Sequence, residues 1–172
     1  MSVGKGFIYQ TAKITPQTRV ELAEDSWIGD FVFVHLSRLK LGRGSQVNPF
    51  ASLTGGGEVF VGDYSVIGYG ARVISGTDTP EAEYMADKAP KQGRRVVRGS
   101  VKIGNNCFIG ANAVICVSQR SQHIEIGDNA VIGALSYVDR NVPKDAVGWG
   151  TPFALLKRRR KQSAGKGVML RQ

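Results

Sequence analysis

VGDYSVIGYGARVISGTD, residues 61–78, is the stretch that decides the fold of this chain. Aliphatic residues recur in it every six positions, at Val61, Ile67 and Val73, and a small residue follows each of them four positions later. A period of six fits neither an α-helix nor a long alternating strand. It is typical of a hexapeptide β-helix, in which each hexad forms one side of a triangular coil and three hexads complete a turn.

The same register extends through most of the chain. Five aliphatic triplets keep the spacing of six: Leu22, Ile28, Val34; Leu41, Val47, Leu53; Val61, Ile67, Val73; Ile103, Ile109, Ile115; and Ile126, Ile132, Val138. A further aliphatic residue precedes each triplet by two positions, so both residues of each such pair point inward on a strand. We therefore predict an all-β fold, a left-handed parallel β-helix of about five triangular coils over residues 20–142.

The two ends of the chain lack the hexad pattern. We predict an N-terminal cap or partial coil over residues 1–19, and a C-terminal helix with a basic tail over residues 143–172. Thr151 reads as the N-cap of a short helix that begins at Pro152 and ends at about residue 161. Its packed side would carry Phe153, Leu155 and Leu156.

Insertions between the triplets all fall at the same corner of the predicted triangle. The third insertion, residues 79–100, is long, polar and without periodicity, and a loop of this kind in a compact fold is usually functional or disordered. The fourth insertion, Ser118–His123, leaves the same corner one coil later. We therefore expect the two insertions to be neighbours in space, with the long loop serving function.

The composition is that of one ordinary globular domain of 172 residues, with 42% hydrophobic residues. The start, MSVGKGFIYQ, lacks the features of a signal peptide, and no apolar run approaches the roughly 20 residues that span a bilayer. We expect a cytoplasmic protein without a membrane span. Of the two cysteines, Cys107 takes a small inward position of its hexad, and neither Cys107 nor Cys116 belongs to a zinc or disulfide pattern.

The net charge of +9 comes mostly from the end of the chain. Seven basic residues lie after residue 156, with no acidic residue among them: Lys157, Arg158, Arg159, Arg160, Lys161, Lys166 and Arg171. Such a tail is either solvated or an anion site. The rest of the chain has a net charge of 9 − 7 = +2, so we do not predict nucleic acid as a partner.

Four stretches together resemble the hexapeptide-repeat acyltransferases, and most of all the maltose, galactoside and polysaccharide O-acetyltransferase branch. They are IGNNCFIGANAVI (103–115), IGDNAVIGALSYV (126–138), DRNVPKDAV (139–147) and GTPFALLKRRR (150–160). The resemblance covers roughly residues 41–161. It implies an acetyl-CoA-dependent enzyme that forms a homotrimer, with active sites between neighbouring prisms and coenzyme A along the prism edge.

The family's catalytic histidine corresponds to Asp78 in this chain, where the long loop begins. Acyl transfer to a hydroxyl needs a general base, and an aspartate serves well only when burial or nearby acids such as Glu81 and Glu83 strengthen it. The chain has two histidines that could serve instead. His123 lies beside the long loop and is the better candidate; His35 begins a different corner two coils earlier, and could face the loop of a neighbouring prism in a trimer.

Further site residues follow from the resemblance and from residue chemistry. Glu81, Glu83, Tyr84 and Phe108 are the expected contacts of the acceptor substrate. The backbone at Gly110, Ala111, Gly133 and Ala134 is expected to pair with the pantetheine amides, since small residues allow close approach. Arg140, Arg158, Arg159 and Arg160 are expected to bind the coenzyme phosphates.

Three functions remain open at this point. The first is transfer of an acetyl group to a hydroxyl of a sugar or glycan precursor. The second is transfer to the amine of a nucleotide-linked amino sugar, which needs less help from a base and would suit Asp78. The third is a scaffold without catalysis. A carbonic anhydrase of this fold needs three histidine ligands, and the chain has two histidines, so we predict no metal.

Overall fold

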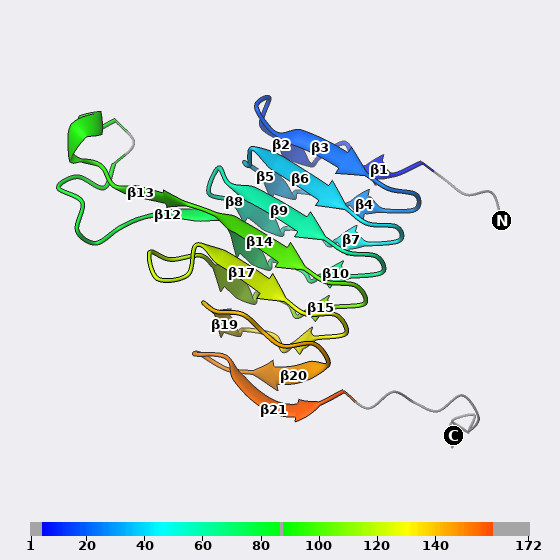
Figure 1. Ribbon diagram of the computed structural model, residues 1–172. Helices are drawn as coiled ribbons and strands as arrows, with labels where there is room; N and C mark the ends of the chain where they lie inside the picture. Colours follow the sequence, from blue (N-terminus) through cyan, green and yellow to red (C-terminus); the bar gives the residue numbers. More distant parts are fainter. Residues whose placement is uncertain (1–4, 87, 160–172) are drawn as a thin grey trace, which may run out of the picture.

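The computed structural model describes residues 5–86 and 88–159, and it shows a left-handed parallel β-helix (Figure 1). The chain winds around a triangular prism with one β-sheet on each side. All-β architecture and the six-residue register are therefore confirmed.

Sheet A contains seven parallel strands and one antiparallel strand at its end. They are β1 (Phe7–Ile8), β4 (Trp27–Ile28), β7 (Gln46–Val47), β10 (Val66–Ile67), β15 (Phe108–Ile109), β18 (Val131–Ile132), β20 (Ala146–Trp149) and the antiparallel β21 (Ala154–Arg158). Sheet B contains β2 (Lys13–Ile14), β5 (Phe33–Val34), β8 (Ser52–Thr54), β11 (Arg72–Ile74), β16 (Val114–Cys116) and β19 (Tyr137–Val138). Sheet C contains β3 (Arg19–Leu22), β6 (Arg38–Leu41), β9 (Glu58–Val61), β14 (Ser100–Ile103) and β17 (His123–Ile126).

Three corners connect the sheets, and the chain passes through them in the order C to A, A to B and B to C in each turn. We call them the C/A, A/B and B/C corners. The hairpin made by β12 (Gly76–Asp78) and β13 (Val96–Arg98) leaves the prism at the B/C corner and projects away from it (Figure 1). A short 3₁₀ helix, η1 (Lys91–Gly93), lies in the loop of this hairpin.

The core is formed by the aliphatic positions that the register predicts. Val73 pairs with Leu53 on one side and with Ile115 on the other, and all three side chains are fully buried. Burying one such side chain stabilises the fold by roughly 1.5–3 kcal/mol. Each layer is covered only by its neighbours, so the stability of the prism is close to a sum over interfaces between turns.

The prism has about seven turns rather than the five predicted. It begins earlier, because Ile8 pairs with Ile28 and Ile14 with Val34. It also continues past Val138, since β20 pairs in parallel with β18. The additional strands were missed because these outer turns carry incomplete triplets, and pairing with a complete neighbouring turn is enough to hold them.

The predicted C-terminal helix is wrong. Residues 154–158 form β21, which pairs antiparallel with β20, and Leu155 and Leu156 are exposed rather than packed. Phe153 does pack against the core, but Pro152 follows a cis peptide bond instead of opening a helix. Pairing with β21 satisfies the backbone N–H and C=O groups of β20, the last parallel strand of the sheet. A helix at residues 154–158 would leave these groups without partners.

Glycines at the B/C corner allow the hairpin to leave the prism. A Cβ on Gly99 would lie 1.7 Å from the carbonyl oxygen of Gln122, and a Cβ on Gly57 would lie 2.1 Å from that of Gly99. The same contacts place the two insertions together, because the N–H of Ser100 donates to Gln122 O. The long loop and the Ser118–His123 insertion are therefore neighbours, as predicted.

Within the described ranges, no helix combines the length and the apolar character needed to cross a lipid bilayer.

Candidate active site

Asp78 is the last residue of β12, at the base of the hairpin. Its Oδ1 lies 2.8 Å from Nη2 of Arg94, on the returning arm. Both side chains are partly buried, with 31% of Asp78 and 19% of Arg94 exposed. The ion pair therefore joins the two arms and fixes the orientation of the Asp78 carboxylate.

The two faces of the hairpin point in opposite directions along the prism. Gly76 pairs with Arg98 and Asp78 with Val96, so these four residues share one face. This face points toward the N-terminal turns, because a Cβ on Gly76 would meet the carbonyl oxygen of Gly55 at 2.2 Å. The opposite face, which carries Thr77 and the buried Val97, points toward the C-terminal turns.

His35 lies at the B/C corner, below the hairpin. The sequence placed it at a different corner, and this is corrected by the structure, in which His35 continues the register Val34–Leu53 and its carbonyl oxygen accepts from Gly56 N. The register error arose because the residue after the third aliphatic of a triplet is already part of the insertion corner. His35 Nδ1 lies 2.9 Å from Gln17 Nε2.

His123 lies on the other side of the hairpin from Asp78. It is the first residue of β17 and pairs with Ser100, on the exposed face of sheet C. Its Nδ1 is 3.0 Å from the Ser100 hydroxyl. The structure thus places Asp78 and His35 on the same side of the hairpin, and His123 on the opposite side.

The acceptor contacts expected in the loop lie far out on the hairpin. Glu81, Glu83 and Tyr84 are all exposed. The N–H of Tyr84 donates to Gly93 O, and its ring covers Gly93, where a Cβ would come within 2.4 Å of the ring. These contacts lie within the loop itself, so these residues would meet an acceptor only if it also contacts the hairpin.

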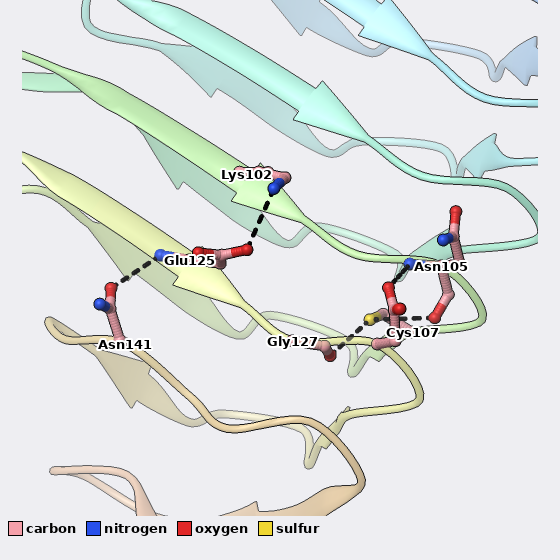
Figure 2. A network of polar contacts seen from close by, with 7 residues as sticks. Lys102, Asn105, Cys107, Glu125, Gly127 and Asn141 are labelled. Atoms are coloured by element: carbon pink, nitrogen blue, oxygen red, sulfur yellow. Dashed lines mark hydrogen bonds and ion pairs between the residues drawn. The ribbon is translucent and has the colours of Figure 1, made fainter.

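At the C/A corner, each turn caps a backbone N–H of the previous turn with a side chain. Asp63 Oδ1 accepts from Arg43 N, Asn105 Oδ1 from Asp63 N, and Asp128 Oδ1 from Asn105 N. Figure 2 shows Asn105 at this corner, near Cys107. The N–H groups of Arg43, Asp63 and Asn105 are therefore already satisfied by the protein.

The equivalent positions at the A/B corner are not capped in this way. In the two turns that contain β15 and β18 these positions are Ala111 and Ala134; the Ala134 side chain cannot accept from Ala111 N–H, and no described side chain of the following turn accepts from Ala134 N–H. Among the described residues, neither N–H donates to a backbone or side-chain acceptor. Two amide donors one turn apart are therefore open to a ligand that runs along this corner.

Glycines let the backbone come close at the same corner. A Cβ on Gly110 would lie 2.4 Å from Ala134 N, and a Cβ on Gly133 would lie 2.6 Å from the Cβ of Trp149. The predicted coenzyme residues Gly110, Ala111, Gly133 and Ala134 are thus brought together by adjacent turns. Phe108 lies on the outer face of sheet A, two residues before Gly110, with 46% of its surface exposed.

The two groups of predicted site residues lie apart in one chain. The alanine donors are at the A/B corner and Asp78 is at the B/C corner, on opposite edges of sheet B. A single prism therefore carries two halves of a possible site and does not join them.

The predicted phosphate ligands are also separated. Arg158 donates to Lys144 O and Arg159 to Asn106 O, so both guanidinium groups are at the C/A corner. Arg140 follows β19 at the B/C corner and pairs with Asp139 at 2.8 Å. Arg160 and the rest of the predicted tail lie outside the described residues.

Sequence reasoning missed Arg94 and Arg98. Charge segregation along the loop was an available signal: the outgoing arm carries Asp78, Glu81 and Glu83, and the returning arm carries Lys88, Lys91, Arg94, Arg95 and Arg98. Opposite charges on the two arms of a hairpin favour pairing across it.

Neither cysteine lies in a reactive environment. Burial raises the pKa of the Cys107 thiol, and burial together with the nearby Asp139 raises the pKa of Cys116. Cys107 Sγ lies 3.2 Å from the carbonyl oxygen of Gly127 (Figure 2). Across the described parts of the chain, no cluster of three or more histidine, cysteine or acidic residues could hold a metal ion.

Comparison with known proteins finds the repeat and several relatives. The model of the hexapeptide repeat of succinyl-transferase matches residues 100–140. The bifunctional protein GlmU of Bdellovibrio bacteriovorus is 30% identical over 136 residues, which are 79% of this chain and 24% of that protein. Galactoside O-acetyltransferase of Escherichia coli is 27% identical over 137 residues, 79% of this chain and 62% of that protein. The chain thus spans less than two thirds of these relatives.

Solved structures with the same fold include two acyltransferases. AntD, an N-acyltransferase from Bacillus cereus in complex with dTDP and 3-hydroxybutyryl-CoA, has a TM-score of 0.76 and 22% identity, covering 89% of this chain and 79% of that chain. A hexapeptide-repeat acetyltransferase from Vibrio cholerae O1 biovar eltor, complexed with acetyl coenzyme A, has a TM-score of 0.66 and 20% identity, covering 84% of this chain and 72% of that chain. The predicted resemblance to the hexapeptide-repeat acyltransferase family is therefore confirmed.

Proposed function

We propose that the protein is an acyltransferase that moves an acetyl group from acetyl-CoA to a sugar or glycan precursor. The observation that carries this proposal is the pair of uncapped N–H donors, Ala111 and Ala134, on adjacent turns of the A/B corner. Pantetheine presents amide carbonyl groups along an extended chain, and these are suitable acceptors for such donors. Relatives that bind coenzyme A share this fold.

The active site would be completed by a second copy of the chain. Asp78 and the alanine donors lie on opposite edges of sheet B, so one prism alone would hold the coenzyme away from the hairpin. A homotrimer would bring the B/C corner of one prism against the A/B corner of the next.

An amine acceptor fits the hairpin better than the hydroxyl acceptor that the sequence favoured. A hydroxyl needs a general base, but Asp78 already accepts from Arg94, and His123 lies on the opposite side of the hairpin. A neutral amine attacks the thioester carbonyl with its own lone pair. AntD, which shares the fold, is an N-acyltransferase.

In this reaction the nitrogen–carbon bond forms and the carbon–sulfur bond breaks. The amine loses one proton, and the departing coenzyme A thiolate takes up one. Asp78 would accept a hydrogen bond from the amine N–H, which orients the lone pair and stabilises the positive charge that develops on nitrogen. Arg94 would act as a positioning residue that holds the carboxylate in place.

Release of coenzyme A from acetyl-CoA, followed with a thiol reagent, tests the proposal. We expect acceptor-dependent release with an amino sugar, less release with the matching sugar that carries a hydroxyl in place of the amine, and an acetylated product by mass spectrometry. Binding of coenzyme A without transfer to any sugar hydroxyl or amine would instead support the scaffold.

A further inference from the structure

A groove of about 410 Å³ lies at the B/C corner, on the side of the hairpin that carries Asp78. Its lining comes from successive turns of the prism and from the base of the hairpin: Gln17, His35, Leu36, Ser37, Gly56 and Arg98. None of these side chains is acidic. The groove is therefore formed where residues that are distant in sequence are stacked by the β-helix.

Arg98 places a guanidinium group in this groove. It lies over Gly56, where an added Cβ would be 3.2 Å from Arg98 Nε, and the positive φ of Gly56, +71°, also favours glycine. Within residues 5–86 and 88–159, the Arg98 side chain makes no hydrogen bond or ion pair, whereas the Arg94 side chain on the same returning arm pairs with Asp78. The groove thus contains a cation whose donors are available to a ligand.

His35 adds a second donor. An amide nitrogen can only donate, so the 2.9 Å contact from Gln17 Nε2 makes Nδ1 of His35 the acceptor. In this arrangement the proton of the neutral ring is on Nε2. His35 and Arg98 both line the groove, so together they can offer N–H donors to an anion bound there.

The position of the groove relative to Asp78 defines the class of anion. Asp78 and Arg98 are diagonal neighbours on one face of the hairpin, and the Cα atoms of such neighbours are about 7 Å apart. This is roughly the span of one sugar ring with its substituents. A sugar whose amine or hydroxyl lies at Asp78 would place a substituent at the other end of its ring beside Arg98, and guanidinium binds phosphate in a bidentate manner.

We propose that this groove binds the phosphate or diphosphate of the acceptor, with Arg98 and His35 as its donors. The acceptor is then a sugar phosphate or a nucleotide-linked sugar rather than a free sugar. This inference rests on the proposed function in placing the reacting group at Asp78, whereas the binding of phosphate by the groove can be tested without catalysis.

Calorimetric titration of the full chain with pyrophosphate, UDP, dTDP, the two nucleosides and coenzyme A tests the groove. We expect the diphosphates to bind and the nucleosides to bind much more weakly. Arg98→Gln should weaken diphosphate binding by roughly tenfold or more, because it removes charged hydrogen bonds, and His35→Asn should weaken it to a smaller extent. Binding of coenzyme A should remain unchanged in both variants.

Arg95→Gln is the matched control, because Arg95 is exposed, lies on the opposite face of the hairpin and should leave binding unchanged. The melting temperature of each variant shows whether it is folded. Equal loss of coenzyme A binding in Arg98→Gln would assign the groove to the coenzyme instead. Failure of pyrophosphate, UDP and dTDP all to bind would overturn the inference, although acetylation of a free sugar would still support the proposed function. Diphosphate binding without any acetyl transfer would keep the groove and reject the enzyme.

Discussion

Arg94 Nη2 lies 2.8 Å from Asp78 Oδ1, and this contact joins the outgoing and returning arms of the hairpin. The two residues are 16 positions apart in sequence and become diagonal neighbours through the pairing of β12 with β13. The two arms are thereby held together at the base of the hairpin, while the loop residues Glu81, Glu83 and Tyr84 beyond it stay exposed.

Arg94→Ala should loosen the hairpin without unfolding the prism. Removing the charged hydrogen bond should lower the free energy of opening the hairpin by about 1–2 kcal/mol. The fraction of molecules with an open hairpin then becomes roughly 5- to 30-fold larger. We expect trypsin to cleave after Lys88 and Lys91 faster by about that factor. Arg95→Ala also removes one trypsin site, but it should leave cleavage at the two lysines unchanged; equal rates in both variants would show that the ion pair does not hold the hairpin.

Gly99→Ala should destabilise the whole fold. The added Cβ would lie 1.7 Å from Gln122 O, so the backbone of two adjacent turns must move, at a cost of about 2–4 kcal/mol. Gly56→Ala should cost only about 1 kcal/mol, because it places a Cβ at an existing positive φ without a backbone clash. Urea denaturation of both variants measures the difference, and equal stabilities would contradict the close packing at this corner.

The two cysteines should react slowly with iodoacetamide in the folded protein. Thiolate is the reactive form and predominates only above the thiol pKa, and burial raises the pKa of both Cys107 and Cys116. We expect little alkylation at pH 8, an increase as the pH rises further, and fast labelling of both thiols in denaturant. Rapid labelling of the folded chain at pH 8 would show that a thiol is exposed and activated.

Phe31 and Phe50 should form part of the proposed contact between prisms. Their rings stack at 5.1 Å at the A/B corner, and 58% and 65% of their surfaces are exposed. Replacing both with aspartate should convert a trimer to a monomer at micromolar concentration, because burying the charges would be costly. Light scattering measures the mass, with Phe60→Asp on sheet C as the control. A monomeric wild-type protein would contradict the composite site.

The hexads predicted the core well because the positions that decide it are local in sequence. Val101 and Ile103 both point inward, because alternate residues of a strand share a face. Both side chains are buried. The end of the chain was harder, because the choice between helix and strand at residues 154–158 depends on the open edge of β20. No pattern within the segment itself reports that edge.

The candidate site was only partly predictable for a related reason. Family resemblance identified Asp78 and the alanine positions, but it did not show that the N–H groups of Ala111 and Ala134 are uncapped, whereas Asp128 caps the N–H of Asn105. The grouping of His35 with Arg98 joins residues 63 positions apart through the stacking of turns. Such contacts depend on which residues of each turn lie at the corner. From the sequence, His35 was assigned to the wrong corner.

The most direct measurement of the central claim is kcat/KM for acetyl transfer from acetyl-CoA by the wild-type protein, Asp78→Asn and His123→Ala, with the affinity for coenzyme A measured alongside. A positioned group that stabilises the charge developing in the transition state contributes on the order of 100-fold or more. We predict that Asp78→Asn lowers kcat/KM by at least about 100-fold, roughly 2.7 kcal/mol. His123→Ala should stay within a few-fold of wild type, and coenzyme A should bind equally to all three. Wild-type rates in Asp78→Asn would contradict the account.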